Sequence, residues 1–269
     1  MINRQLALAT ACVLLIAGAA LYGGILFVGS AAPQKDRDII FQASTIDALL
    51  QGAMDGTVSF AEMKKHGDFG TGCFEGNDGE FIALDGEFYQ TRSDGSVIPV
   101  TDEMTTPFAA VTFFDHDGTL VFDEPMNLSV FEKRLEERLP SQNLFYAIRI
   151  DGTFPYIKAR NVPKQEKPYP PLADAVEEQA VFEFRNTTGS LIGFWTPELA
   201  KGVNIPGYHL HYITDDRTGG GHILELEFDR AEVKIDQTAG FSMLLPTEGE
   251  FLAVDLGGDL QSDLEKVEK

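Results

Sequence analysis

The sequence is short of cysteine, and this excludes a fold stabilised by disulfide bonds. Only two cysteines occur in 269 residues. Cys12 lies inside an apolar N-terminal run, so the rest of the chain contains Cys73 and no second cysteine to pair with it. We interpret Cys73 as a small buried residue and not as a nucleophile, because no histidine lies near it in the sequence. A hydrophobic core must therefore hold the fold together.

Positive charge is also scarce, and this excludes several partners. The chain carries 21 Lys and Arg against 42 Asp and Glu, which gives a formal net charge of -21. A surface of this charge cannot neutralise phosphates, so nucleic-acid binding is excluded and docking to anionic lipid is disfavoured. The sequence also lacks a glycine-rich phosphate cradle, which leaves no site for a pyridoxal or thiamine cofactor.

The N-terminus contains the longest apolar run of the chain. Arg4 precedes apolar residues 6 to 28, and small residues then lead to Pro33. This order is typical of an export signal, and a run of about 23 residues is also long enough to span a bilayer. Residues 1–32 are therefore expected to be a signal peptide or a membrane anchor through residues 6–28. In both cases the rest of the protein is extracytoplasmic, either secreted or tethered.

The remaining chain has the composition of a globular α+β protein. Hydrophobic residues make up 43% and aromatic residues 10% of the sequence. Short helical patterns, one of which begins near Ser44, are separated by many strand-like segments. The dipeptides Asp85-Gly86 and Asp151-Gly152 each predict a turn between two strands. The glycine-rich residues 70 to 80 are also expected to form a turn region, and residues 262 to 269 a final helical turn.

A proline-rich connection suggests where the chain divides. Pro163, Pro168, Pro170 and Pro171 lie too close together to fit inside a sheet. We therefore predict an N-terminal domain over residues 33–162 and a C-terminal domain over residues 163–269.

Three of the five histidines fall within one short segment. His209 and His211 lie on a strand over residues 208 to 213, a turn follows, and His222 begins a second strand. The hairpin places His222 opposite His211, or opposite His209 if the register slips by two residues. In either register all three imidazoles share one face. Three nitrogen donors with an open fourth position are typical of a catalytic zinc site.

Other interpretations of this hairpin remain open. The histidines can be satisfied polar residues on a half-buried strand. The hairpin also fits another metalloenzyme on a β-scaffold, such as a cupin-like oxygenase or hydrolase. A third alternative is a non-catalytic metal-binding module at a surface.

Several stretches together resemble the alpha-acetolactate decarboxylase family. They are residues 44 to 50, 79 to 95, 145 to 152, 193 to 197 and 208 to 222. The resemblance implies an α/β (α+β) fold of two mixed β-sheet domains with a few flanking helices. It also implies a metal site on a hairpin of the C-terminal domain, one zinc ion per chain and a homodimer. The implied reaction is the decarboxylation of 2-acetolactate to acetoin and carbon dioxide without an organic cofactor.

The resemblance also assigns roles to residues of this sequence. His209, His211 and His222 match the metal ligands, while Arg160, Glu80 and Glu268 match catalytic positions, with Glu265 as an alternative to Glu268. The chemistry agrees, because zinc can chelate the ketone and hydroxyl oxygens and stabilise the enediolate left by decarboxylation. Arg160 suits the substrate's carboxylate or other polar oxygens. Glu80 and Glu268 are candidate proton donors. Without the resemblance, Glu80 would be interpreted as an ordinary carboxylate at a strand edge and Glu268 as part of a frayed tail.

Overall fold

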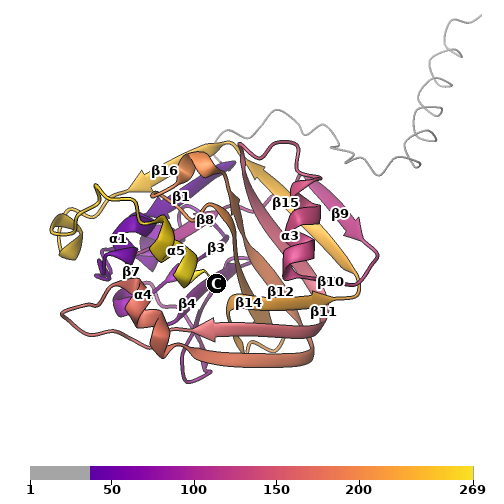
Figure 1. Ribbon diagram of the computed structural model, residues 1–269, viewed down its shortest axis with the longest axis horizontal. Coiled ribbons are helices and arrows are strands. Elements are labelled where there is room, and N and C mark those ends of the chain that lie inside the picture. Colours follow the sequence, from indigo (N-terminus) through magenta and orange to yellow (C-terminus); the bar gives the residue numbers. More distant parts are fainter. Residues whose placement is uncertain (1–36, 269) are drawn as a thin grey trace, which may run out of the picture.

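The computed structural model describes residues 37–268, in which two seven-stranded β-sheets carry a few short helices (Figure 1). The predicted α+β class is confirmed. The predicted signal or anchor over residues 1–32 lies outside the described residues. Within residues 37–268, no helix combines the length and the apolar character needed to cross a membrane.

The first sheet is mixed. Its strand order is β16-β1-β8-β3-β4-β5-β6. Strand β1 runs parallel to β16, and every other pair in this sheet is antiparallel. The strands are β1 (Ile39–Ala43), β3 (Phe69–Cys73), β4 (Glu80–Leu84), β5 (Glu87–Thr91), β6 (Val97–Pro99), β8 (Ala109–Thr112) and β16 (Gly240–Leu244).

All described strand pairs of the second sheet are antiparallel. The prediction of two mixed sheets is therefore correct only for the first sheet. Its order is β10-β14-β13-β12-β11-β15-β9, and β14 also pairs with β11. This extra pairing closes strands β11 to β14 into a ring. The strands are β9 (Gly118–Phe122), β10 (Met126–Asn127), β11 (Phe145–Asn161), β12 (Ala180–Thr196), β13 (Gly207–Thr214), β14 (Gly220–Phe228) and β15 (Ala231–Thr238).

The helices are short and begin at side-chain caps where the sequence offers one. Thr45 accepts a hydrogen bond from the Ala48 amide and Ser59 accepts one from the Glu62 amide. The α-helices are α1 (Ile46–Leu50), α2 (Phe60–Met63), α3 (Leu128–Glu136), α4 (Leu172–Ala175) and α5 (Gln261–Val267), and a two-stranded sheet joins β2 (Val58–Ser59) to β7 (Thr105–Thr106). Helix α5 confirms the helical turn predicted for the tail.

The two Asp-Gly dipeptides behave differently. Asp85 and Gly86 have φ angles of 55° and 79°, and they form the predicted two-residue turn between β4 and β5. The turn predicted at Asp151-Gly152 is wrong, because these residues pair with Ser190 and Gly189 in the middle of β11 and β12. Neither has a positive φ among the described residues. The continuous partner strand β12 keeps the chain extended there.

The glycine-rich residues 70 to 80 are only partly a turn. Residues up to Cys73 form β3, and the turn is the 3-10 helix η2 (Glu75–Asn77). A Cβ atom at Gly70 would lie 2.3 Å from the Ala110 carbonyl oxygen of β8. Glycine is thus needed for a close approach of two strands and not for a turn.

The sheets do not divide the chain at residue 162 as predicted. The proline-rich connection links β11 to β12, which pair with each other from Tyr146 to Asn161. Strand β9 also belongs to the second sheet, and β16 returns to the first. The prolines therefore lie in a loop between two strands of one sheet.

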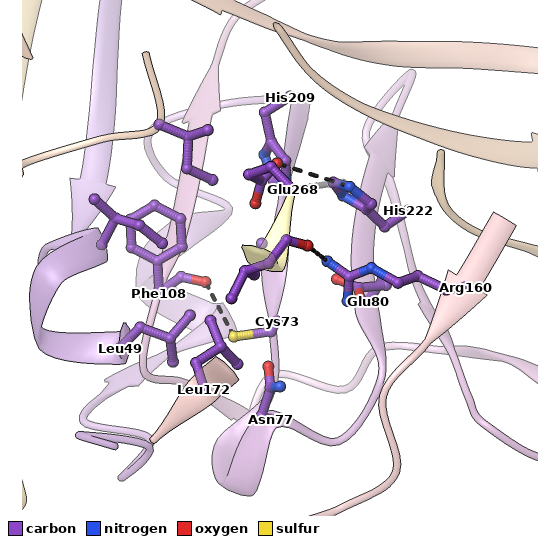
Figure 2. Close-up of a pocket in the computed structure, with 14 residues that line it drawn as sticks. Leu49, Cys73, Asn77, Glu80, Phe108, Arg160, Leu172, His209, His222 and Glu268 are labelled. Carbon is purple, nitrogen blue, oxygen red and sulfur yellow. Dashed lines mark hydrogen bonds and ion pairs between the residues drawn. The ribbon is translucent and has the colours of Figure 1, made fainter. Parts of the chain in front are cut away.

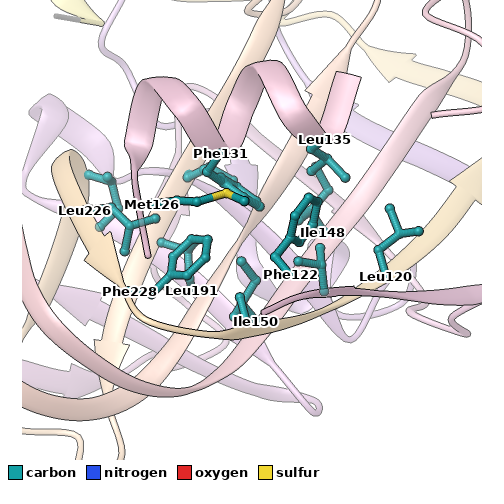
Figure 3. Packing of buried hydrophobic residues seen from close by; sticks show 14 of the residues in the cluster. Leu120, Phe122, Met126, Phe131, Leu135, Ile148, Ile150, Leu191, Leu226 and Phe228 are labelled. Atoms are coloured by element: carbon teal, nitrogen blue, oxygen red, sulfur yellow. The ribbon is translucent and has the colours of Figure 1, made fainter. Parts of the chain in front are cut away.

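Several apolar clusters hold the sheets, and two of them position the site. Phe131 and Leu135 of α3 pack on the second sheet against Phe122, Ile148 and Phe228 (Figure 3). A second cluster joins the sheets to each other, and its members come from both: Ile40, Phe69, Ile82 and Leu84 from the first, and Phe145, Ala147, Ile192, Phe194 and Ile213 from the second. This contact fixes β3 and β4 against β13, where the candidate site lies.

Candidate metal centre and active site

The three histidines converge on one point between the sheets. His211 pairs with His222 across β13 and β14, so the first predicted register is confirmed. One ring nitrogen from each of His209, His211 and His222 lies within 4.8 Å of the others, and the Nε2 atoms of His209 and His211 are 3.2 Å apart. All three side chains are buried. The hairpin therefore presents three nitrogen donors to a common centre.

A close approach of backbones brings the third histidine into place. Strand β14 leaves β13 after His222 and joins β11, where His222 lies opposite Arg160. At Gly221 a Cβ atom would lie 2.5 Å from the Arg160 carbonyl oxygen, and φ is 154°. Only glycine fits this crossing, which sets His222 beside both His211 and Arg160.

Contacts from the first sheet orient two of the imidazoles. The carbonyl oxygen of Phe81 lies 3.0 Å from Nδ1 of His211, so this Nδ1 carries the hydrogen and Nε2 keeps its lone pair. The hydroxyl of Thr71 lies 3.3 Å from Nδ1 of His209. Such contacts hold a ligating imidazole in one orientation and one tautomer.

The imidazoles are neutral. Burial, with a contribution from the charge of Arg160, lowers the pKa of His209 to about 3. Burial also lowers the pKa values of His211 and His222 well below their ordinary value. Neutral imidazoles with lone pairs facing one centre are the donors that zinc and related divalent metals accept. The residues therefore fit a metal ion.

Two carboxylates flank this centre. An oxygen of Glu80, at the start of β4, lies 3.7 Å from Nε2 of His211, and an oxygen of Glu268 lies 3.7 Å from Nε2 of His222. Burial raises the pKa of both carboxyl groups to about 7, against the opposing charge of Arg160. Near neutral pH each group can therefore hold or release a proton.

Arg160 links Glu80 to the tail. Its side chain is buried, with Nη1 3.6 Å from an oxygen of Glu80, and Nη2 donates a hydrogen bond of 2.9 Å to the Val267 carbonyl oxygen. It comes from the end of β11, near the predicted strand end. A buried guanidinium beside Glu80 and the carbonyl of Val267 is a component of the site and not a solvated surface charge.

Glu268, and not the alternative Glu265, reaches the centre. Leu264 and Val267 of α5 pack beside Leu49 of α1 and Leu172 of α4, and these helices lie together in Figure 1. This packing fixes the end of α5 over the pocket. Glu265 lies on the exposed side of the helix.

The pocket between these groups has two different ends (Figure 2). His209, His222, Glu80, Arg160 and Glu268 form a polar end. The opposite wall is mainly apolar, with Leu49, Cys73, Phe108 and Leu172. Burial raises the pKa of the Cys73 thiol well above its usual value, which agrees with its interpretation as a buried residue and not a nucleophile.

Sequence reasoning missed Thr71 and Asn77. Thr71 contacts His209, and Asn77 lines the pocket. Thr71 lies in the glycine-rich stretch that we expected to form a turn. The inward-facing strand β3 was therefore not predicted. Alternation along residues 69 to 73 could have indicated a strand, but the glycines removed that signal.

Comparison with known proteins agrees with this geometry. A family model described as Alpha-acetolactate decarboxylase matches residues 40–258. An alpha-acetolactate decarboxylase of Methanosarcina mazei is 55% identical over 232 residues, which cover 86% of this chain and 81% of that protein. The crystal structure of alpha-acetolactate decarboxylase from Bacillus subtilis strain 168 superposes with a TM-score of 0.83. It is 43% identical, and the match covers 86% of this chain and 99% of the other.

Together, the fold, the buried centre and these similarities define an enzyme of the carboxy-lyase class. The chain belongs to the alpha-acetolactate decarboxylase family.

Proposed function

We propose that the protein converts 2-acetolactate to acetoin and carbon dioxide with one zinc ion per chain, held by His209, His211 and His222. The observation that carries this proposal is the convergence of three neutral imidazoles beside two carboxylates and one buried arginine. The chain's family membership supports the choice of substrate. When bound, zinc supplies Lewis-acid stabilisation of negative charge on neighbouring oxygens.

Arg160 orients the substrate. Its guanidinium is always charged and can pair with a carboxylate or another substrate oxygen. Its bond to the Val267 carbonyl and its proximity to Glu80 hold it in one position. A fixed cation at the pocket wall selects one orientation of an anionic substrate.

Glu80 and Glu268 deliver the proton. Loss of carbon dioxide leaves the bonding electron pair on the substrate, and the carbon that bore the carboxylate must then accept a proton. A carboxyl group with a pKa near 7 is partly protonated at neutral pH and can donate it. Donation from one side of the pocket would give acetoin of one handedness.

One assay tests the reaction. The purified chain is mixed with 2-acetolactate, and acetoin, carbon dioxide and oxygen consumption are followed together. The proposal requires equimolar acetoin and carbon dioxide without oxygen uptake. Oxygen uptake would favour the cupin-like oxygenase, and bound metal without any product would favour the non-catalytic module.

We also propose that residues 1–32 carry the protein out of the cytoplasm, and that two copies associate. The apolar run over residues 6–28 supports export or a membrane tether. Leu244 and Leu245, which are both 45% exposed at the end of edge strand β16, offer apolar surface for a homodimer. Cell fractionation with N-terminal sequencing tests the first proposal, and the mass in solution tests the second.

A further inference from the structure

Asn77 is a pocket residue for which the site described above gives no role. It ends the 3-10 helix η2, three positions before Glu80, and its side chain is 4% exposed. It lines the same pocket as His209 and His222. Figure 2 shows its amide at the far end of the pocket, directed toward Cys73 and Leu172.

The amide of Asn77 has no hydrogen-bond partner within residues 37–268, although its backbone is well held. The Asn77 carbonyl accepts from the Gly79 amide at 3.0 Å, and the Gly76 amide donates to Met54 at 2.8 Å. The Gln90 side chain also donates a hydrogen bond of 2.6 Å to the Asp78 carbonyl oxygen, so this turn is held without the Asn77 side chain. The side-chain amide is therefore available to bond a molecule held in the pocket that Asn77 lines.

Backbone conformation alone does not explain the residue. Asn77 has a φ of 52°, in the left-handed region that asparagine and glycine tolerate best. Glycine would satisfy the same backbone without burying a polar group. The amide itself therefore needs an explanation.

The chemistry of the pocket supplies an explanation for the Asn77 amide, which rests on the function proposed above. When the ketone and hydroxyl oxygens of 2-acetolactate face the histidines, its carboxylate is the one polar group that remains. Leu49, Cys73 and Leu172 offer that carboxylate no hydrogen bond at the opposite end. We propose that the side-chain amide of Asn77 donates a hydrogen bond to the substrate carboxylate, on the oxygen that faces away from Arg160.

A neutral donor suits a group that must lose its charge. The carboxylate is an anion in the bound substrate and leaves as neutral carbon dioxide. A second cation would stabilise the bound anion more than the transition state and would slow the reaction. An amide contributes about half the strength of a charged donor, so it positions the carboxylate with less stabilisation of the starting state.

Three variants test this proposal. Asn77→Leu keeps a similar volume without a donor, Asn77→Gly keeps the backbone conformation, and Asn77→Asp places a carboxylate against the substrate carboxylate. We expect kcat/KM for 2-acetolactate to fall about 5- to 10-fold in the first two variants, the loss of one neutral hydrogen bond. It should fall further in Asn77→Asp.

The inhibition constant of acetoin separates carboxylate binding from a change in loop shape. Acetoin keeps the ketone and hydroxyl but has no carboxylate, so its inhibition constant should stay within about twofold of wild type in every variant. Wild-type kcat/KM in Asn77→Leu and Asn77→Asp would overturn the proposal, as would an equal loss of acetoin binding. A wild-type protein that forms no acetoin would instead overturn the proposed function itself.

Discussion

Arg160 contacts several groups of the site. It lies 3.6 Å from Glu80, donates to the carbonyl of Val267 and faces His222 across the β11–β14 pair. Burial raises the pKa of Glu80 and Glu268, and the charge of Arg160 opposes this rise. Burial also lowers the pKa of each histidine of the centre, and the charge of Arg160 adds to that fall. A single guanidinium thus contributes to both the geometry and the protonation of its neighbours.

The Arg160→Ala variant is expected to retain zinc and to lose catalysis. The histidine donors remain, but the substrate is no longer oriented, so kcat should fall about 100-fold or more. Arg160→Lys keeps the charge without the planar fork and should recover only part of the rate. Zinc content and steady-state kinetics measure both, and Arg185→Ala, at an exposed position of β12, serves as the control. A change in KM with an unchanged kcat would contradict the role.

At the scale of elements, α5 is held mainly by two apolar side chains and by one bond from Arg160. Leu264 and Val267 pack against α1 and α4, and Glu268 follows them beside His222. The helix has only two turns and its described N-terminus has no side-chain cap. Packing and not helix propensity therefore keeps Glu268 in the site.

Replacing Glu268 is expected to affect the chemistry, whereas replacing Glu265 on the same helix is not. Glu268→Gln removes a proton donor near His222, so kcat should fall about 10- to 100-fold and the handedness of acetoin should be eroded. Glu265→Gln should match wild type. Chiral chromatography of the product, together with kcat, gives the comparison. Equal behaviour of the two variants would remove Glu268 from the mechanism.

The two Asp-Gly dipeptides provide a matched test of the turn. At Gly86 a Cβ atom would lie 4.0 Å from the Cβ of Asp68, an ordinary contact, but the residue must adopt a φ of 79°. Gly152 lies in a strand, and a Cβ atom there would meet nothing within 4 Å. Gly86→Ala should lower the free energy of unfolding by about 1 kcal/mol, and Gly152→Ala should leave it unchanged or raise it slightly. Urea unfolding of both variants checks this, and an equal cost would show that φ is not the cause.

The same dipeptides show what the sequence could predict about single elements. The turn at Gly86 and the histidine hairpin follow from local residues, so local patterns predicted them. The turn at Gly152 did not form, because β12 pairs through it from more than 30 positions away. Strand β3 was missed for a related reason, because its glycines are needed for the close approach of the β8 backbone. Non-local pairing decided both cases.

At the scale of the molecule, each sheet contains strands from both parts of the chain, and no local sequence pattern indicates this. The predicted ligands and catalytic residues meet because β4, β11, β13, β14 and α5 converge, although they are distant in the sequence. The family resemblance named these residues, but spacing alone gave only the histidines. The proline-rich loop resembled a domain linker in composition, and only the pairing of β11 with β12 shows its actual place.

Acidic side chains gather where the chain passes between the sheets. Asp236 of β15 is 1% exposed, and one of its oxygens accepts from the Asp115 amide. Burial raises its pKa to about 7, and the nearby Asp38, Asp115 and Asp117 add to this rise. The folded state thus holds the Asp236 proton up to about pH 7, whereas the unfolded chain releases it near the ordinary value of 3.8.

Stability is therefore expected to fall as the pH rises from about 4 to 7, because the folded state binds more protons in that window. Asp236→Asn should remove this loss and raise the free energy of unfolding at pH 8 by about 2 to 4 kcal/mol relative to wild type. At pH 4 the two proteins should be similar. Thermal unfolding across this range measures the difference, with Asp229→Asn, at an exposed position, as control. A gain that does not depend on pH would contradict the assignment.

The most direct test of the metal centre is a titration of chelator-treated protein with zinc, in which acetoin formation from 2-acetolactate is followed at each step. We predict no activity before addition and a linear recovery that ends at one zinc ion per chain. The His209→Ala variant should neither bind this ion tightly nor recover. Full activity of the metal-free protein, or recovery in His209→Ala equal to that of wild type, would contradict the three-histidine centre.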